Sequence, residues 1–143
     1  MKSILAFVLL FLSSWTFAQN HVQWNFHYDA TSESVIAEGK IDAGWHLYSK
    51  KTDENAGPIA TKMVLLPNKS VKLIDNSIED LEPHEIFDKN FESTVYLFET
   101  KYRVHQKIKI KKPTTIKGEM HYMICDDTKC LPPISVPFTL EIN

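Results

Sequence analysis

The chain has 143 residues, with 16 Lys and Arg residues against 18 Asp and Glu residues, so its formal net charge is −2. This mild acidity argues against a protein that binds nucleic acid by electrostatic attraction. The length suits one compact domain, and no linker-like, repeated or low-complexity tract interrupts the sequence.

The amino terminus predicts export. Lys2 precedes an apolar run over residues 4–12, and small residues end at Ala18. This is the pattern of a secretory signal peptide, so residues 1–18 are predicted to be removed and residues 19–143 to form the mature domain. The run is too short to span a bilayer comfortably, and no second apolar segment of about 20 residues follows, so no membrane span is expected.

The mature sequence contains many short segments in which apolar and polar residues alternate. In the first, Val22–Tyr28, apolar residues recur at every second position, which is typical of a half-buried β-strand. Further strand candidates are Ser34–Ile41, Trp45–Ser49, Ile59–Leu66, Ser93–Phe98, Tyr102–Ile110, Ile116–Ile124 and Ile134–Ile142, and Ser77–Leu81 suggests a helical turn. This many short strands, separated by turn residues, predicts an all-β, immunoglobulin-like two-sheet antiparallel sandwich.

The two cysteines of the chain, Cys125 and Cys130, are separated by four residues. In the predicted fold Cys125 ends one strand and Leu131–Pro133 lead into the last one, so the pair lies at a hairpin tip. Facing residues of an antiparallel ladder have Cβ atoms about 4.5–5.5 Å apart, and a disulfide needs about 3.5–4.5 Å, so a bridge is feasible. In an exported protein the disulfide is the default state.

Three functions are open for this pair on the residues alone. In a binding module the disulfide is structural, although closing a loop of about six residues restricts the unfolded chain by only about 2 kcal/mol. In a redox module, a short exposed bridge is accessible to a partner's thiolate and readily exchanged. In a carrier of Cu(I) or zinc, the thiols join His121 and Met123, which share a predicted strand face with Cys125. The residues do not separate the first two functions, and support for the metal site is thinner.

The segment "GEMHYMICDDTKCLPP", followed by "SVPFTLEI", resembles the end of the amino-terminal periplasmic domain of the thiol:disulfide interchange protein DsbD. "AGWHLYSK" (Ala43–Lys50) resembles that family's Gly-aromatic-x-Leu-Tyr strand, and "HEIFDKNFESTVY" (His84–Tyr96) occupies the place of its cap segment. The resemblance covers roughly residues 20–142. It implies a periplasmic immunoglobulin-like domain that passes on reducing equivalents by thiol-disulfide exchange. Such a domain is a redox-active module rather than a free-standing enzyme, and it needs no bound cofactor and no metal.

The resemblance also implies roles for the cysteines. Cys130 matches the cysteine that forms the mixed disulfide with partners, and Cys125 then matches the resolving thiol. The implied partners are thioredoxin-fold proteins: a periplasmic disulfide isomerase or a cytochrome-maturation thioredoxin, and a membrane-linked electron donor. Better-known members have five residues between the cysteines rather than four, and they continue into a membrane domain and a thioredoxin-like domain, whereas this chain stops at Asn143. The resemblance therefore predicts a stand-alone monomer that receives its electrons from another polypeptide.

Three further residues match supporting positions of the family. Tyr48 matches one of two hydroxyl-bearing aromatic residues beside the cysteines, and His46 stands at the other position. An imidazole there could hydrogen-bond to a leaving thiolate or protonate it, and the alternative is an ordinary exposed strand histidine. Phe87 is the closest match to the phenylalanine that covers the bridge, with Phe91 as the alternative.

Overall fold

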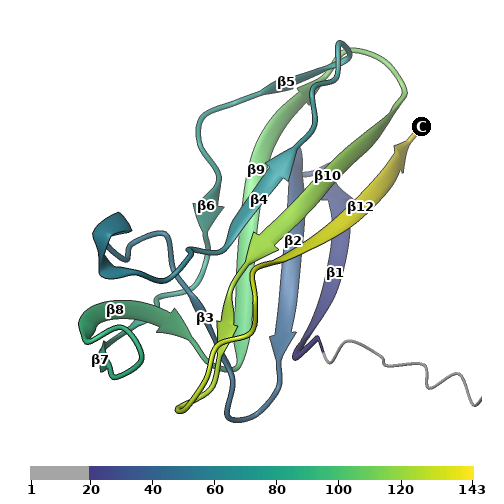
Figure 1. Ribbon diagram of the computed structural model, residues 1–143. Coiled ribbons are helices and arrows are strands. Elements are labelled where there is room, and N and C mark those ends of the chain that lie inside the picture. Colours follow the sequence, from purple (N-terminus) through teal and green to yellow (C-terminus); the bar gives the residue numbers. More distant parts are fainter. Residues whose placement is uncertain (1–19) are drawn as a thin grey trace, which may run out of the picture.

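The computed structural model describes residues 20–143, and the predicted signal peptide, residues 1–18, lies outside them. The strands pair antiparallel throughout this range and form three groups (Figure 1). Within residues 20–143, no helix is long and apolar enough to cross a membrane.

The first sheet has the order β1-β2-β9-β5, and a further short strand, β6, also pairs with β9. β1 and β2 form a continuous ladder from the pair Val22 and Ile41 to the pair Asp29 and Ser34. The alternation in the sequence explains β9, in which every second side chain from Tyr102 to Ile108 is buried, whereas β2 is buried at each of its first four residues. The bounds are β1 Val22–Asp29, β2 Ser34–Ile41, β5 Val71–Leu73, β6 Ile78–Glu79 and β9 Lys101–Ile110.

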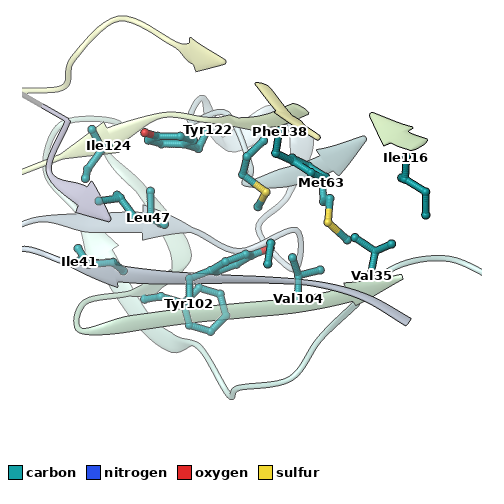
Figure 2. Close-up of a cluster of buried hydrophobic side chains, with 14 of the residues drawn as sticks. Val35, Ile41, Leu47, Met63, Tyr102, Val104, Ile116, Tyr122, Ile124 and Phe138 are labelled. Carbon is teal, nitrogen blue, oxygen red and sulfur yellow. The ribbon is translucent and has the colours of Figure 1, made fainter. Parts of the chain in front are cut away.

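The second sheet packs against the first and has the order β12-β10-β4. Its strands are β4 Lys62–Leu65, β10 Thr114–Tyr122 and β12 Ile134–Ile142. Apolar side chains of both sheets form one buried cluster, which includes Val35, Tyr102 and Val104 from the first sheet and Met63, Ile116 and Phe138 from the second (Figure 2). The rings of Phe26 and Phe138 stack across the interface, with centroids 4.2 Å apart. This core confirms the predicted two-sheet sandwich.

A third group of strands, which includes β3, β7 and β8, lies at one end of the sandwich (Figure 1). Its strand β11 ends at Cys125, which pairs with Cys130. Its order is β11-β3-β8-β7, and a short 3-10 helix, η1 (Glu54–Ala56), lies next to β8. The bounds are β3 His46–Tyr48, β7 His84–Asp88, β8 Ser93–Phe98 and β11 Ile124–Cys125. These elements bring together the three segments that carry the resemblance described above.

The predicted strands match observed ones to within three residues except at two places, and β5 and β7 lie in segments where no strand was predicted. The helical turn predicted for Ser77–Leu81 is wrong, because Ile78 and Glu79 form the short strand β6 against β9. The strand predicted for Ile116–Ile124 is interrupted at Met123, where the chain passes from the second sheet to the third group. Strands of two residues leave no readable periodicity, so only the backbone of a partner strand defines them.

Substitution of Gly118 tests the fit between β10 and its two neighbours. A Cβ atom added at Gly118 would lie 2.8 Å from Cε1 of Phe138 and 2.9 Å from the carbonyl oxygen of Val64. Such overpacking costs about 1–3 kcal/mol, so Gly118→Ala is expected to lower the free energy of unfolding by that amount in urea titrations. Lys117→Ala, at the exposed neighbouring position, is the control. An unchanged midpoint for Gly118→Ala would contradict this packing.

Candidate functional site

The cysteines close a short hairpin at the end of β11. Cys125 and Cys130 face each other, and their Cα atoms are 4.0 Å apart. Backbone hydrogen bonds flank the pair: the Leu131 N–H donates to the Ile124 carbonyl at 2.9 Å, and the Asp126 N–H donates to the Lys129 carbonyl at 2.9 Å. Cys125 and Cys130 are therefore a facing pair that exchanges no backbone hydrogen bonds, and in an antiparallel ladder the side chains of such pairs lie closest together. A disulfide joins the two cysteines.

The side chain of Asp126 holds the loop between the cysteines in shape. One carboxylate oxygen accepts hydrogen bonds from the backbone N–H groups of Thr128 and Lys129, both at 2.8 Å, and from the Thr128 hydroxyl at 3.0 Å. The bonds from the two backbone N–H groups, Thr128 first, hold the pKa of Asp126 below its ordinary value. The Lys129 ammonium lies 5.8 Å from the centroid of the Trp45 ring. The loop is therefore an ordered turn with its polar side chains in solvent.

The two cysteine residues differ in exposure. Cys125 is 0% exposed and belongs to a buried cluster with Tyr48, Val95 and Leu97, whereas Cys130 is only partly buried and packs on the edge of that cluster. The neighbours Tyr122 and Ile124 are anchored in the main core (Figure 2). A molecule that approaches the disulfide from solvent therefore meets Cys130 first.

β3 places His46 beside the cysteines. Cys125 faces His46 across the β11–β3 ladder and faces Cys130 on its other side. Facing residues of neighbouring strands point to the same side of a sheet, so the three form one row in the order His46, Cys125, Cys130. His46 is 7% exposed. The alternative of an ordinary exposed strand histidine is therefore wrong.

Buried hydrogen bonds connect His46 to two further titratable side chains. Its Nε2 lies 3.0 Å from the Tyr48 hydroxyl, and this hydroxyl donates to Oδ2 of Asp88 at 2.6 Å. Asp88 ends β7 and is 3% exposed, and its other carboxylate oxygen accepts from the Asn90 N–H at 2.7 Å. The side-chain amide of Asn90 in turn donates to the backbone carbonyl of Asp126 at 3.2 Å. The network thus joins β3, the hairpin between β7 and β8, and the cysteine loop.

Burial shifts the pKa values of this network. It lowers the pKa of His46, against the opposing effect of four carboxylates led by Asp88. Burial, followed by the hydrogen bond to Asp88, raises the pKa of Tyr48 far above its ordinary value. Around neutral pH the pair therefore consists of a neutral imidazole and a neutral phenol.

The sequence did not single out Asp88 and Asn90. They stand at the start of the polar turn between β7 and β8, where Asp and Asn are common for local reasons. Their contacts with Tyr48 and with the cysteine loop depend on how this hairpin packs. The sequence shows only that Asp88 directly follows the apolar pair Ile86 and Phe87 in the cap segment. This pattern is too common to assign a role to Asp88.

Phe91 rather than Phe87 packs towards the cysteines. Phe87 lies on the outside of β7 and is 64% exposed. The Phe91 ring meets the Tyr48 ring edge-on at 5.8 Å and packs on the buried cluster that contains Cys125. The structure therefore places Phe87 in solvent, and it places the alternative residue, Phe91, on the cluster that contains Cys125.

The residues considered for a metal site are not brought together. His121 lies on β10, facing Lys62 and Ser135, and its Nε2 is 3.0 Å from a carboxylate oxygen of Glu119. Cys125 lies beyond the break at Met123, in the third group of strands. In the described part of the chain, no group of three or more His, Cys, Asp and Glu side chains is arranged to hold a metal ion.

The sequence matches one family model, described as thiol:disulfide interchange protein DsbD, N-terminal, over residues 16–141. A search of curated proteins finds no match.

Solved structures of DsbD and ScsB N-terminal domains share the fold of this chain. The reduced DsbD n-terminal domain of Neisseria meningitidis is 14% identical, with a TM-score of 0.65 and 86% of each chain covered. A complex between the DsbD and PilB N-terminal domains of the same organism gives 13% identity, a TM-score of 0.63 and coverage of 85% of this chain and 84% of that one. The N-terminal periplasmic domain of ScsB from Proteus mirabilis is 13% identical in sequence, with a TM-score of 0.55. This match covers 86% of this chain and 46% of the ScsB chain. These matches confirm the predicted immunoglobulin-like fold.

The different positions of the two phenylalanines predict different effects on access to the disulfide. Phe91→Ala is expected to increase the rate of reduction by dithiothreitol several-fold, because the ring that packs on the cysteine cluster is removed. Phe87→Ala removes an exposed ring and should leave the rate unchanged. Free thiols would be counted by alkylation and mass spectrometry during reduction. Faster reduction of the Phe87 variant alone would show that Phe87, and not Phe91, limits access to the disulfide.

Proposed function

Because the chain belongs to the family of amino-terminal domains of the thiol:disulfide interchange protein DsbD, we propose that it is an exported module that relays reducing equivalents by thiol-disulfide exchange through Cys125 and Cys130. The observation that carries the proposal is the unequal exposure of the two cysteines of a disulfide on a short hairpin, with Cys130 partly exposed and Cys125 fully buried. Exchange needs a thiol that a partner can reach and a second thiol that can expel the partner.

The exposure of the cysteines supports a division of roles. Cys130, the partly exposed cysteine, forms the mixed disulfide with the partner. Cys125 is buried directly beside it and resolves that mixed disulfide by attacking the Cys130 sulfur. The same order is implied by the position of each cysteine in the family's loop. Asp126 supports both steps because its hydrogen bonds keep the loop turned with the cysteines facing each other.

The partners in this proposal are thioredoxin-fold proteins of the periplasm. The DsbD N-terminal domain of Neisseria meningitidis forms a complex with the PilB N-terminal domain, so a relative of this fold binds another protein domain. The ScsB relative is described as periplasmic, and the predicted signal peptide at residues 1–18 would deliver this chain to the same compartment.

A purely structural disulfide is the competing function, and the fold argues against a need for one. The two sheets enclose a continuous apolar core that does not include the cysteines themselves. A loop this short stabilises a protein by only about 2 kcal/mol, which adds little to such a core. The midpoint potential separates the two functions.

We expect the Cys125–Cys130 pair to have a midpoint potential between about −180 and −270 mV, the range of exchange proteins. The protein would be equilibrated in graded thiol buffers and alkylated, and the labelled thiols would be counted by mass. A potential below about −300 mV would identify a structural disulfide and overturn the proposal.

The roles of the cysteines predict unequal trapping of partners. Cys125→Ala is expected to accumulate a mixed disulfide with an oxidised thioredoxin-fold protein several-fold more than Cys130→Ala does, because the partly exposed Cys130 thiol remains and its resolving thiol is gone. Non-reducing electrophoresis with mass spectrometry of the adduct measures this. Equal trapping by the two variants would refute the division of roles.

A further inference from the structure

We propose that His46 is the base that accepts the proton of the Cys125 thiol in the resolving step, and that Tyr48 and Asp88 position it by fixing its tautomer. This inference rests on the proposed function, in which Cys125 attacks the mixed disulfide at Cys130. It concerns a residue at which the sequence carries His where the family resemblance implies a hydroxyl-bearing aromatic side chain.

The register of the strands places the base next to the thiol. His46 and Cys125 are a facing pair of the β3–β11 ladder, and such pairs have Cβ atoms about 4.5–5.5 Å apart on the same side of the sheet. Cys125 stands between His46 and Cys130 in one row. A proton can therefore leave the Cys125 sulfur on one side while that sulfur attacks Cys130 on the other.

The hydrogen bonds of Tyr48 decide which imidazole nitrogen is free. A carboxylate only accepts hydrogen bonds, so the one proton of the Tyr48 hydroxyl goes to Asp88 at 2.6 Å. The Tyr48 oxygen must then accept at its contact with His46, and Nε2 of His46, 3.0 Å away, carries the proton. A neutral imidazole has one N–H, so Nδ1 keeps its lone pair. Nδ1 is thus the nitrogen that can accept a proton.

The charges around His46 set the pH range in which this base exists. Burial lowers the pKa of His46, and four carboxylates oppose that shift: Asp88 at the end of β7, Asp127 and Asp126 in the cysteine loop, and Glu99 after β8. Burial has the larger effect, so the neutral, basic form is present at neutral pH and is lost only as the pH falls below the lowered pKa. A base that is neutral at the working pH suits a thiol that must lose its proton to react.

The proton and the electrons of the step balance. Nδ1 of His46 takes the proton from the Cys125 thiol, and the resulting thiolate attacks the Cys130 sulfur of the mixed disulfide. The bond between Cys130 and the partner sulfur breaks, and the partner leaves as a thiolate. The imidazolium returns its proton to that thiolate or to water. The cysteine pair is oxidised by two electrons, and the partner's disulfide is reduced by two electrons.

The reaction of the reduced protein with 5,5′-dithiobis(2-nitrobenzoate) isolates this step. Attack by Cys130 releases one thionitrobenzoate, and attack by Cys125 on the mixed disulfide releases the second in a phase whose rate is independent of reagent concentration. His46→Gln is expected to slow this second phase by roughly a hundredfold at neutral pH. The rates of variant and wild type should converge once the pH exceeds the pKa of the thiol. The matched control is His105→Gln, which removes a histidine of β9 that forms a hydrogen bond with Asp80. This variant should keep the pH profile of the wild type.

The outcomes separate this inference from the function on which it rests. Absence of a second phase in the wild type would refute the resolving role of Cys125 and both proposals with it. A normal second phase whose pH profile is the same in wild type and His46→Gln, or is lowered equally at every pH, would refute the base alone.

Nitrogen chemical shifts of the His46 ring in the wild-type protein test the tautomer without any substitution. The proton is expected on Nε2, and both tautomers should be populated in Tyr48→Phe. A proton on Nδ1 in the reduced wild type would overturn the proposal, whatever the folding of the variants.

Discussion

The geometry of the site depends on a backbone pairing that is only two residues long. Ile124 and Cys125 pair with Leu47 and His46, and this ladder is the point at which the chain leaves the second sheet and joins the third group of strands. The side chains of Leu47 and Ile124 are fully buried in the main core, so apolar packing fixes the ladder that positions the polar pair beside it (Figure 2). The chemistry of the hairpin thus rests on hydrophobic contacts one residue away.

The buried polar side chains tie the site to the cap. A buried carboxylate or imidazole without partners is costly, and an unsatisfied buried polar group costs about 1–3 kcal/mol. Tyr48 supplies the partner that satisfies both His46 and Asp88. Asn90 extends the connection from Asp88 to the cysteine loop. The hairpin of β7 and β8 and the loop therefore hold each other in place through hydrogen bonds as well as through the Phe91 ring.

Periodicity predicted the long strands because each has one face in the core, as in Tyr102–Ile110, which matches β9 to within one residue, and Ile134–Ile142, which matches β12. It could not predict β5 and β6, whose two or three residues are defined by the backbone of β9. In the site, spacing indicated the facing cysteines, and the resemblance indicated His46 and Tyr48. The burial of His46, the contribution of Asp88 and the choice between Phe87 and Phe91 required the packing of the cap hairpin, which contacts Tyr48 and the cysteine loop from 40 and 36 residues away in sequence.

The unequal burial of the two cysteines also bears on chemical damage. In the reduced protein, a peroxide from solvent would meet Cys130 before Cys125, and oxidation of its thiol would give a sulfenic acid. Because the Cys125 thiol is its facing neighbour, that sulfenic acid condenses to the disulfide with loss of water before a second oxidant arrives. The hairpin therefore converts an oxidation that would otherwise proceed to irreversible sulfinic and sulfonic acids into the bridge that the fold already accommodates.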